Sequence, residues 1–289
     1  MGPGPEERNL LGDNTQKWSV KFLTEYLKWD LVVENYDITK AKIKAKNGLD
    51  TILQCFDPFY NKKINIIMEC KYRSETESIN LSKLTDMVYR LKNKIEISQY
   101  TAAFSNTLFE EKIHDGEKWV GLLFLKLKAY DHNALMETIN SVEISGSKEA
   151  PTLLGIIANY RIAKLREFLK GRDSVEFYYP VHGQNKDPIW QRYLSYSYLF
   201  SDLIAGRYRT KNGIFSFVIS FEEPSEENVK YISTVIKTWY IRKEIKTVYF
   251  TEGSNMDIQQ LESLKPEDLD FEIAIINGDL SLNINVEDL

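Results

Sequence analysis

The spacing of apolar and polar residues divides the first half of the chain into a helix, a group of short strands, a second helix and a further strand. Residues 14–29 have a helical period, with one apolar stripe that includes Trp18, Phe22 and Tyr26. The elements expected up to residue 130 are a helix at 14–29, strands at 31–36, 39–46, 49–56 and 63–72, a helix at 81–104 and a strand at 118–130.

The second half shows helical and strand patterns in alternation, which favours a parallel sheet with crossover helices. The polar segment 143–151 contains Gly and Pro and is interpreted as a domain boundary. The expected fold class is therefore α/β, with a first domain at 1–142 and a second α/β domain of unknown role, in substrate or partner binding, at 152–289. The elements expected in the second domain are helices at 152–171, 188–206 and 226–242 and strands at 175–181, 214–221, 246–251 and 271–276.

The composition narrows the class of protein. A chain of 289 residues is long enough for two domains or one large one. Its hydrophobic content of 43% is ordinary for a folded protein, and no apolar run reaches the length of a membrane helix. Two cysteines, Cys55 and Cys70, and three scattered histidines supply neither a disulfide scaffold nor a zinc knuckle. We expect a cytoplasmic protein with no membrane partner.

The net charge of −5 argues against nucleic-acid binding until its distribution is considered. Residues 249–289 hold ten acidic residues and one basic residue, so the rest of the chain has an excess of basic residues. The strand at 39–46 places Lys42, Lys44 and Lys46 on one side. These lysines are expected either to contact nucleic-acid phosphates or to shield an exposed strand edge from aggregation.

Charged residues also occur within strand segments that otherwise look like sheet core. Glu69 and Lys71 share one face of their strand, because successive side chains point to opposite sides. Cys70 lies on the other face and is expected in the apolar core. If this strand pairs with the preceding one through the loop between them, Asp50 lies beside Glu69 and Lys71.

Two carboxylates that converge in this way repel each other and resist desolvation unless a cation compensates them. Mg²⁺ prefers oxygen ligands and retains several water molecules. A lysine beside such an ion can position or deprotonate a water molecule and neutralise charge on a phosphate. Asp50, Glu69 and Lys71 are therefore the residues expected to carry the chemistry.

The order of elements around these residues resembles the PD-(D/E)xK nuclease superfamily, and is most similar to its Mrr-like restriction enzymes and archaeal Holliday-junction resolvases. A helix and a strand meander with a lone acid, Asp50, precede the Glu69-Cys70-Lys71 triplet, and a helix and a strand follow it, within residues 12–130. The resemblance implies an αβββαβ restriction-endonuclease-like core. It also implies that Asp50, Glu69 and the backbone carbonyl of Cys70 bind Mg²⁺, or Mn²⁺, while Lys71 assists the attacking water.

The function implied by the resemblance is a metal-dependent endonuclease that hydrolyses phosphodiester bonds in nucleic acid. DNA is the expected substrate, although the sequence does not separate DNA from RNA. The resemblance further suggests a role in bacterial restriction or anti-phage defence, with a second protein subunit or a homo-oligomer as partner.

One position departs from the family pattern. Members often carry an additional acid on the first helix, where this chain has Gln16 on the apolar stripe and Glu25 off its edge. An amide can bind a metal-bound water or a phosphate, so Gln16 is a candidate site residue. The departure and the acidic C-terminus favour an alternative function, that of a non-cleaving nucleic-acid-binding or assembly subunit with a nuclease-like fold.

Overall fold

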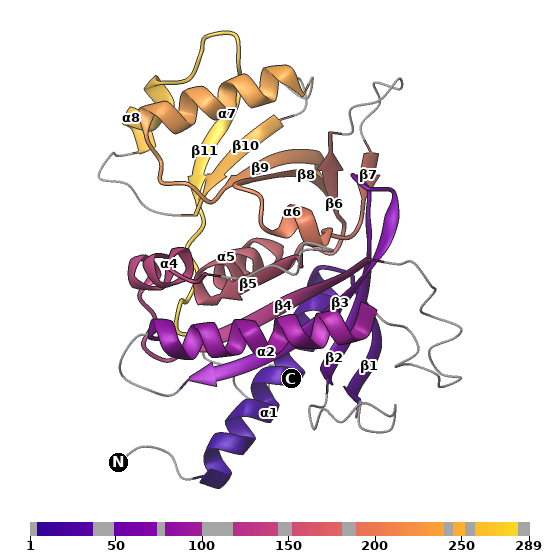
Figure 1. The fold of residues 1–289 in the computed structure, drawn as a ribbon. Coiled ribbons are helices and arrows are strands. Elements are labelled where there is room, and N and C mark those ends of the chain that lie inside the picture. The colour runs from indigo at the N-terminus through magenta and orange to yellow at the C-terminus, as the bar shows by residue number, and fades with distance from the viewer. Residues whose placement is uncertain are drawn as a thin grey trace. The chain divides into compact units, whose positions relative to one another are not determined.

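A computed structural model describes eight segments of the chain and divides it into two compact units (Figure 1). Unit 1 comprises residues 1–162 and 279–289, and unit 2 comprises residues 163–278. Each contains a mixed sheet and helices, which confirms the α/β class. None of the described helices is long and apolar enough to cross a membrane. The described segments are residues 5–36, 49–73, 79–99, 118–143, 152–180, 189–239, 245–251 and 258–282.

Unit 1 is built on a five-stranded sheet. Its elements in chain order are α1 (Pro5–Lys21), the π-helical turn η1 (Phe22–Tyr26), β1 (Asp30–Tyr36), β2 (Leu49–Asp57), β3 (Lys62–Arg73), α2 (Leu81–Gln99), β4 (Lys118–Leu127), α4 (His132–Asn140) and β5 (Leu154–Ala158). The strand order follows the chain, from β1 to β5. β1, β2 and β3 form an antiparallel meander, whereas β3, β4 and β5 are parallel to one another.

The helices α1 and α2 cover opposite faces of this sheet. α2 packs on the face that carries Ile67 and Leu123, and Trp18 of α1 meets Phe124 on the other face, with ring centroids 5.9 Å apart. α2 comes so close to β4 that a Cβ added at Gly121 would lie 2.5 Å from a side-chain carbon of α2. β3 is therefore buried over residues 64–69 and becomes partly exposed from residue 70 onward. Its charged residues lie where this burial ends.

Unit 2 contains a six-stranded sheet, and the division between the units falls inside α5. The elements from that point are α5 (Asn159–Leu169), β6 (Val175–Tyr179), β7 (Ile189–Gln191), α6 (Tyr196–Leu199), β8 (Leu203–Thr210), β9 (Gly213–Ser220), α7 (Glu226–Thr238), β10 (Ile245–Phe250), α8 (Ile258–Ser263) and β11 (Glu272–Ile275). The strand order is β11-β10-β9-β8-β6-β7. β9, β10 and β11 are parallel, but β7, β6, β8 and β9 pair in antiparallel fashion. The expected parallel sheet is thus correct for one half of unit 2.

The domain boundary expected at 143–151 is wrong. β5 follows it and pairs in parallel with β4, so the first sheet continues past this segment, and the units divide between Ile162 and Ala163. The helix expected at 152–171 starts only at α5, because the apolar run before it is a strand, and periodicity alone does not separate a short buried strand from a helix. The helix expected at 188–206 is also wrong, since this segment contains β7, α6 and β8.

Other expected elements agree with the structure more closely. β1, β2, β3, α2 and β4 lie in unit 1 in the expected order, and β6, β9, α7, β10 and β11 occur in unit 2. The first helix begins at Pro5, earlier than expected, and α4 and α8 were not anticipated. The strand expected at 39–46, with Lys42, Lys44 and Lys46, lies outside the described residues.

Candidate active site

The hairpin of β2 and β3 brings Asp50 and Glu69 to neighbouring positions on one face of the sheet. Thr51 pairs with Met68 in an antiparallel register, and one further step of this register places Asp50 opposite Glu69. The turn begins at Asp57, whose carboxylate accepts backbone hydrogen bonds within it. The strand pairing expected from the sequence is therefore confirmed.

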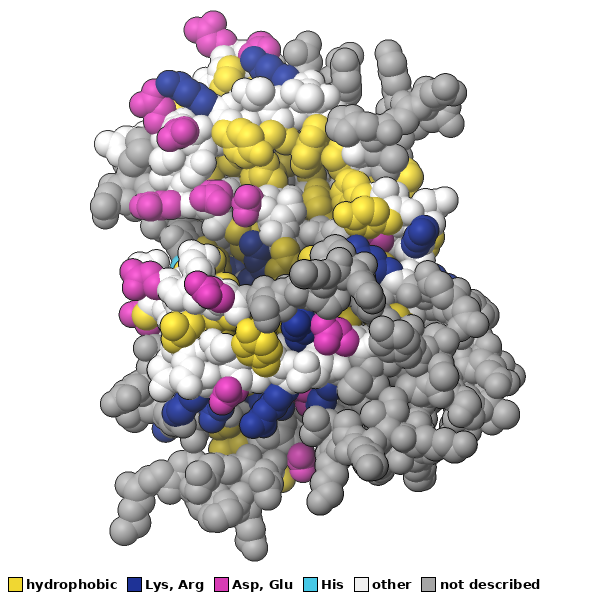
Figure 2. Space-filling view, in the orientation of Figure 1, with side chains coloured by type: hydrophobic (Ala, Val, Ile, Leu, Met, Phe, Trp, Pro, Cys, Tyr) yellow, Lys and Arg dark blue, Asp and Glu magenta, His cyan; other side chains and the backbone are white. Residues whose placement is uncertain are grey.

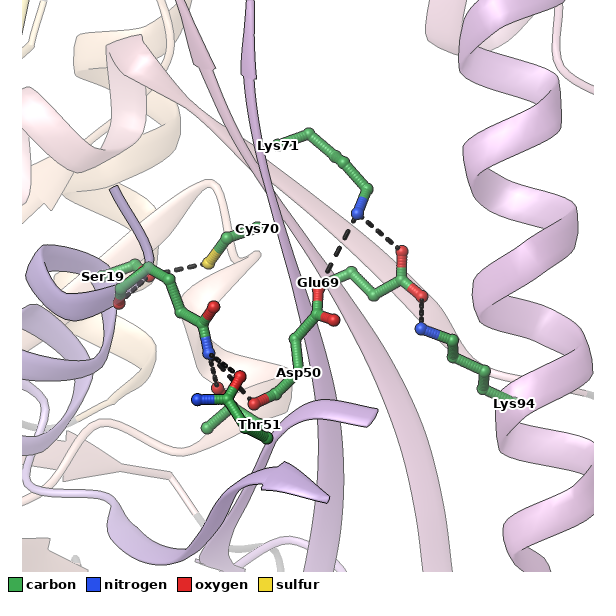
Figure 3. A network of polar contacts seen from close by, with 9 residues as sticks. Ser19, Asp50, Thr51, Glu69, Cys70, Lys71 and Lys94 are labelled. Atoms are coloured by element: carbon green, nitrogen blue, oxygen red, sulfur yellow. Dashed lines mark hydrogen bonds and ion pairs between the residues drawn. The ribbon is translucent and has the colours of Figure 1, made fainter. Parts of the chain in front are cut away.

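Lys71 lies between the two carboxylates (Figure 3). Its Nζ is 3.7 Å from Oδ2 of Asp50 and 3.3 Å from Oε2 of Glu69. The side chain of Glu69 is 2% exposed, whereas those of Asp50 and Lys71 are 29% and 33% exposed. The three side chains form a charged cluster in which Glu69 is buried and Asp50 and Lys71 form a partly exposed rim.

α2 contributes a second lysine, Lys94, that the sequence analysis missed. Its Nζ forms an ion pair with Oε1 of Glu69, the other carboxylate oxygen (Figure 3). The side chain of Lys94 is only 10% exposed, so this pair is formed away from bulk water. Lys94 follows the buried Leu91 by three residues and so takes a position on the apolar stripe of α2. That position was the available signal, because a buried ammonium group needs a carboxylate partner.

Gln16 reaches the strand that carries Asp50, but it does not contact the carboxylates in the described hydrogen bonds. Its side-chain Nε2 donates to the backbone carbonyl of Asp50 at 3.1 Å and lies 3.4 Å from Oγ1 of Thr51. It lies 3.4 Å from Oδ1 of Asn35 on β1 as well. The expectation that Gln16 lies near the site is met, and its contacts are those of a residue that positions the backbone at Asp50.

Cys70 points to the side of the sheet opposite Glu69 and Lys71, as the alternation of the strand requires. Its Sγ lies 2.7 Å from Oγ of Ser19 on α1 (Figure 3). Cys70 is partly rather than fully buried as a residue, which differs from the expected place in the apolar core. Burial raises the pKa of its thiol to about 12, so the thiol stays protonated at neutral pH and is not a thiolate ligand. The metal-ligand role of the Cys70 backbone carbonyl stays a prediction.

The donor set of this site suits a hard divalent cation that keeps most of its water. Among the described residues, no three His, Cys, Asp or Glu side chains converge as a metal-binding group. Two carboxylates do converge, and Mg²⁺ is commonly bound through one or two carboxylates with several water molecules. Asp50 and Glu69 therefore fit Mg²⁺ or Mn²⁺ as candidate ligands. Lys71 and Lys94 supply the positive charge that balances these carboxylates in the structure.

No family model, no curated protein and no solved structure matches this chain.

Proposed function

We propose that this protein is a metal-dependent endonuclease that hydrolyses phosphodiester bonds in nucleic acid, with DNA as the expected substrate. The convergence of Asp50, Glu69 and Lys71 on one sheet face, at the edge of the buried part of β3, carries this proposal. The order α1, β1, β2, β3, α2, β4 is the order of the PD-(D/E)xK superfamily core and supports it further.

The residues of the site have distinct roles in this proposal. Asp50 and Glu69 would hold Mg²⁺ or Mn²⁺, which when bound stabilises charge on the reacting phosphate and lowers the pKa of a coordinated water. Lys71 is on the partly exposed rim, where its ammonium can orient the attacking water and offset negative charge on the phosphate. Lys94 holds Glu69 from the buried side, so that the carboxylate keeps one orientation.

The surroundings of the site also suit an anionic substrate. α2 carries four basic residues. Lys92 and Lys94 are buried and form ion pairs with acids, whereas Lys83 and Arg90 are more exposed. Figure 2 shows Lys and Arg side chains gathered along α2, with apolar and acidic side chains among them. Basic groups near a phosphodiester site contribute affinity that depends on salt and not on sequence. A role in restriction or anti-phage defence, with a second protein or a homo-oligomer as partner, is part of the proposal and follows from the resemblance alone.

A second candidate function is that of a non-cleaving nucleic-acid-binding or assembly subunit. Two observations favour it: both Glu69 oxygens are engaged by lysines, and the Gln16 amide contacts backbone at a place where related nucleases often carry an acid. A site in which ammonium groups replace the metal would bind an anionic strand without activating water.

Incubation of the full chain with supercoiled plasmid separates the two functions. The nuclease proposal predicts nicking or linearisation with Mg²⁺ or Mn²⁺ and none with EDTA. Lys71→Ala should lower the rate by about 10²- to 10⁴-fold, the usual contribution of a positioned acid–base group, in a variant that still folds cooperatively. Lys63→Ala is the matched control, because Lys63 lies exposed at the other end of β3 on the same strand side. Full activity in Lys71→Ala would refute the assignment, and a folded wild type that binds DNA without cutting it would establish the second function.

A further inference from the structure

Unit 2 has a pocket of about 200 Å³ whose lining is rich in arginine. Three arginines, Arg192, Arg207 and Arg209, share it with one acid, Glu176, and with Ile214 at its edge. Three guanidinium groups against one carboxylate leave the pocket with a net positive charge. The chain as a whole has a net charge of −5, so the pocket departs from the general character of the protein.

Strand register explains why these side chains meet. Arg207 on β8 is opposite Glu176 on β6, and Arg209 on β8 is opposite Ile214 on β9. Residues two apart on a strand point to the same side, so Arg207 and Arg209 share a sheet face with the buried Ala205. Arg207 and Arg209 therefore lie on the same face of the sheet as the apolar cluster that contains Ala205.

Burial changes along this face. Near its apolar end, Ala205 and Val218 pack with Ile232 of α7 in one buried cluster, and Trp239 stacks on Tyr178 with ring centroids 5.7 Å apart. Further along β8 the strand becomes partly exposed at Arg207 and exposed at Arg209. The part of this face that carries Arg207 and Arg209 is therefore accessible to a ligand from solvent.

The central arginine is held in one orientation from two sides. Nε of Arg207 donates to Oε2 of Glu176 at 2.7 Å, and its guanidinium lies 4.2 Å from the ring centroid of Trp190 on β7. An arginine has five N–H donors, and this bond engages the Nε–H. A guanidinium that is already oriented loses less side-chain entropy when it binds an anion.

We propose that this pocket binds phosphate groups of a nucleic-acid strand. Guanidinium groups match phosphate oxygens through paired N–H donors. The Cα atoms of Arg207 and Arg209 are about 6.7 Å apart on one strand, from the rise of about 3.3–3.4 Å per residue. Two such donors can contact two phosphates of one polymer, whereas a nucleoside monophosphate offers only one. The inference rests on the proposed function, because that function makes a nucleic acid the substrate.

Salt-dependent binding of an oligonucleotide to the full chain, in EDTA so that no cleavage occurs, tests this inference. The variant Arg192→Gln with Arg209→Gln removes two exposed charges from the pocket. The matched control is Lys170→Gln with Lys230→Gln, which removes two exposed charges of unit 2 outside the pocket lining. The pocket variant should lower the slope of log affinity against log salt by about 1.8 on duplex DNA or about 1.4 on a single strand, at about 0.9 or 0.7 per phosphate contact.

Three outcomes would overturn the inference: a slope equal to that of wild type, an equal loss in the control variant, or displacement of the oligonucleotide by a mononucleotide at equal concentration. Failure of the pocket is distinguishable from failure of the proposed function. A wild type that cleaves plasmid while the pocket variant keeps its slope refutes the pocket alone. A changed slope in a protein that never cleaves refutes the nuclease and leaves the phosphate-binding pocket in place.

Discussion

The two charged clusters of this protein have opposite organisation. In unit 1 an acid, Glu69, lies at the centre with its side chain 2% exposed and ammonium groups around it. In unit 2 an arginine, Arg207, lies at the centre, and it and its partner Glu176 are 32% and 31% exposed. Buried charges need close compensation, whereas water and salt screen exposed pairs. In our proposals the first cluster holds a divalent cation and the second binds phosphate.

The same substitution at the two acids should have very different effects on stability. Glu69→Gln leaves the buried ammonium of Lys94 without its carboxylate and should cost about 3–5 kcal/mol of unfolding free energy. Glu176→Gln breaks a partly exposed pair and should cost about 1 kcal/mol or less. Chemical denaturation of the two variants and wild type measures both.

A double variant serves as the control for this comparison. Glu69→Gln with Lys94→Met removes both partners of the buried pair and should recover most of the lost stability, because no unpaired charge remains. Equal losses in Glu69→Gln and Glu176→Gln would show that burial does not distinguish the two clusters.

A third group of basic residues, Lys42, Lys44 and Lys46, lies outside the described residues and provides a further test of phosphate binding. If they contact phosphates, changing all three to Gln should lower the salt slope of duplex binding by about 0.9 for each lost contact. Cleavage at saturating DNA should continue, because these residues would position the backbone only. If they instead shield a strand edge, the triple variant binds with the wild-type slope and aggregates more readily. A salt titration with light scattering separates these results.

A pH-dependent effect on stability is expected at Lys126 on β4. Burial lowers the pKa of its ammonium group to about 8, and Asp279 opposes this shift. Between about pH 8 and the usual lysine value, the unfolded chain binds a proton that the folded chain does not, so wild-type stability rises with pH there. Lys126→Met lacks this group, so its Tm should exceed that of wild type most below pH 8, with a difference that shrinks towards pH 10.

Lys128→Met is the control for this pH dependence, because Lys128 is exposed two residues further along the chain. Its Tm difference from wild type is the baseline with which the pH dependence of Lys126→Met is compared. A Lys126→Met difference that grew with pH would contradict the sign of the shift.

Asp50, Glu69 and Lys71 could be predicted from the sequence because side chains along a strand alternate strictly between its two faces. A period of two fixes that Glu69 and Lys71 share a face, and the short loop before β3 fixes the pairing that brings in Asp50. The contact of Lys94 with Glu69 was not predictable in the same way. It depends on how α2 crosses β3, which packing decides and the local pattern does not contain.

In unit 2, periodicity alone did not predict the secondary structure of one segment. The segment at 188–206 is rich in aromatic residues, and its pattern alone predicts one helix. Ser195 instead accepts a hydrogen bond from the backbone N–H of Tyr198 and caps the short helix α6. Tyr198 in turn accepts a hydrogen bond from the backbone N–H of Ala205 on β8. The local cap starts a short helix, and the contact between α6 and β8 helps to hold the strand that follows it.

Calorimetric titration of the full chain with Mg²⁺ and Mn²⁺ tests most directly whether Asp50 and Glu69 form a divalent-cation site. Asp50→Asn is the informative variant, because Asp50 is on the partly exposed rim and its loss leaves the pairs of Glu69 with both lysines in place. Asp86→Asn, an exposed acid on α2, is the control. Wild type and Asp86→Asn should bind the cation, and Asp50→Asn should bind it at least about tenfold more weakly, a loss of about 1.4 kcal/mol. Equal binding by wild type and Asp50→Asn would contradict a shared metal site.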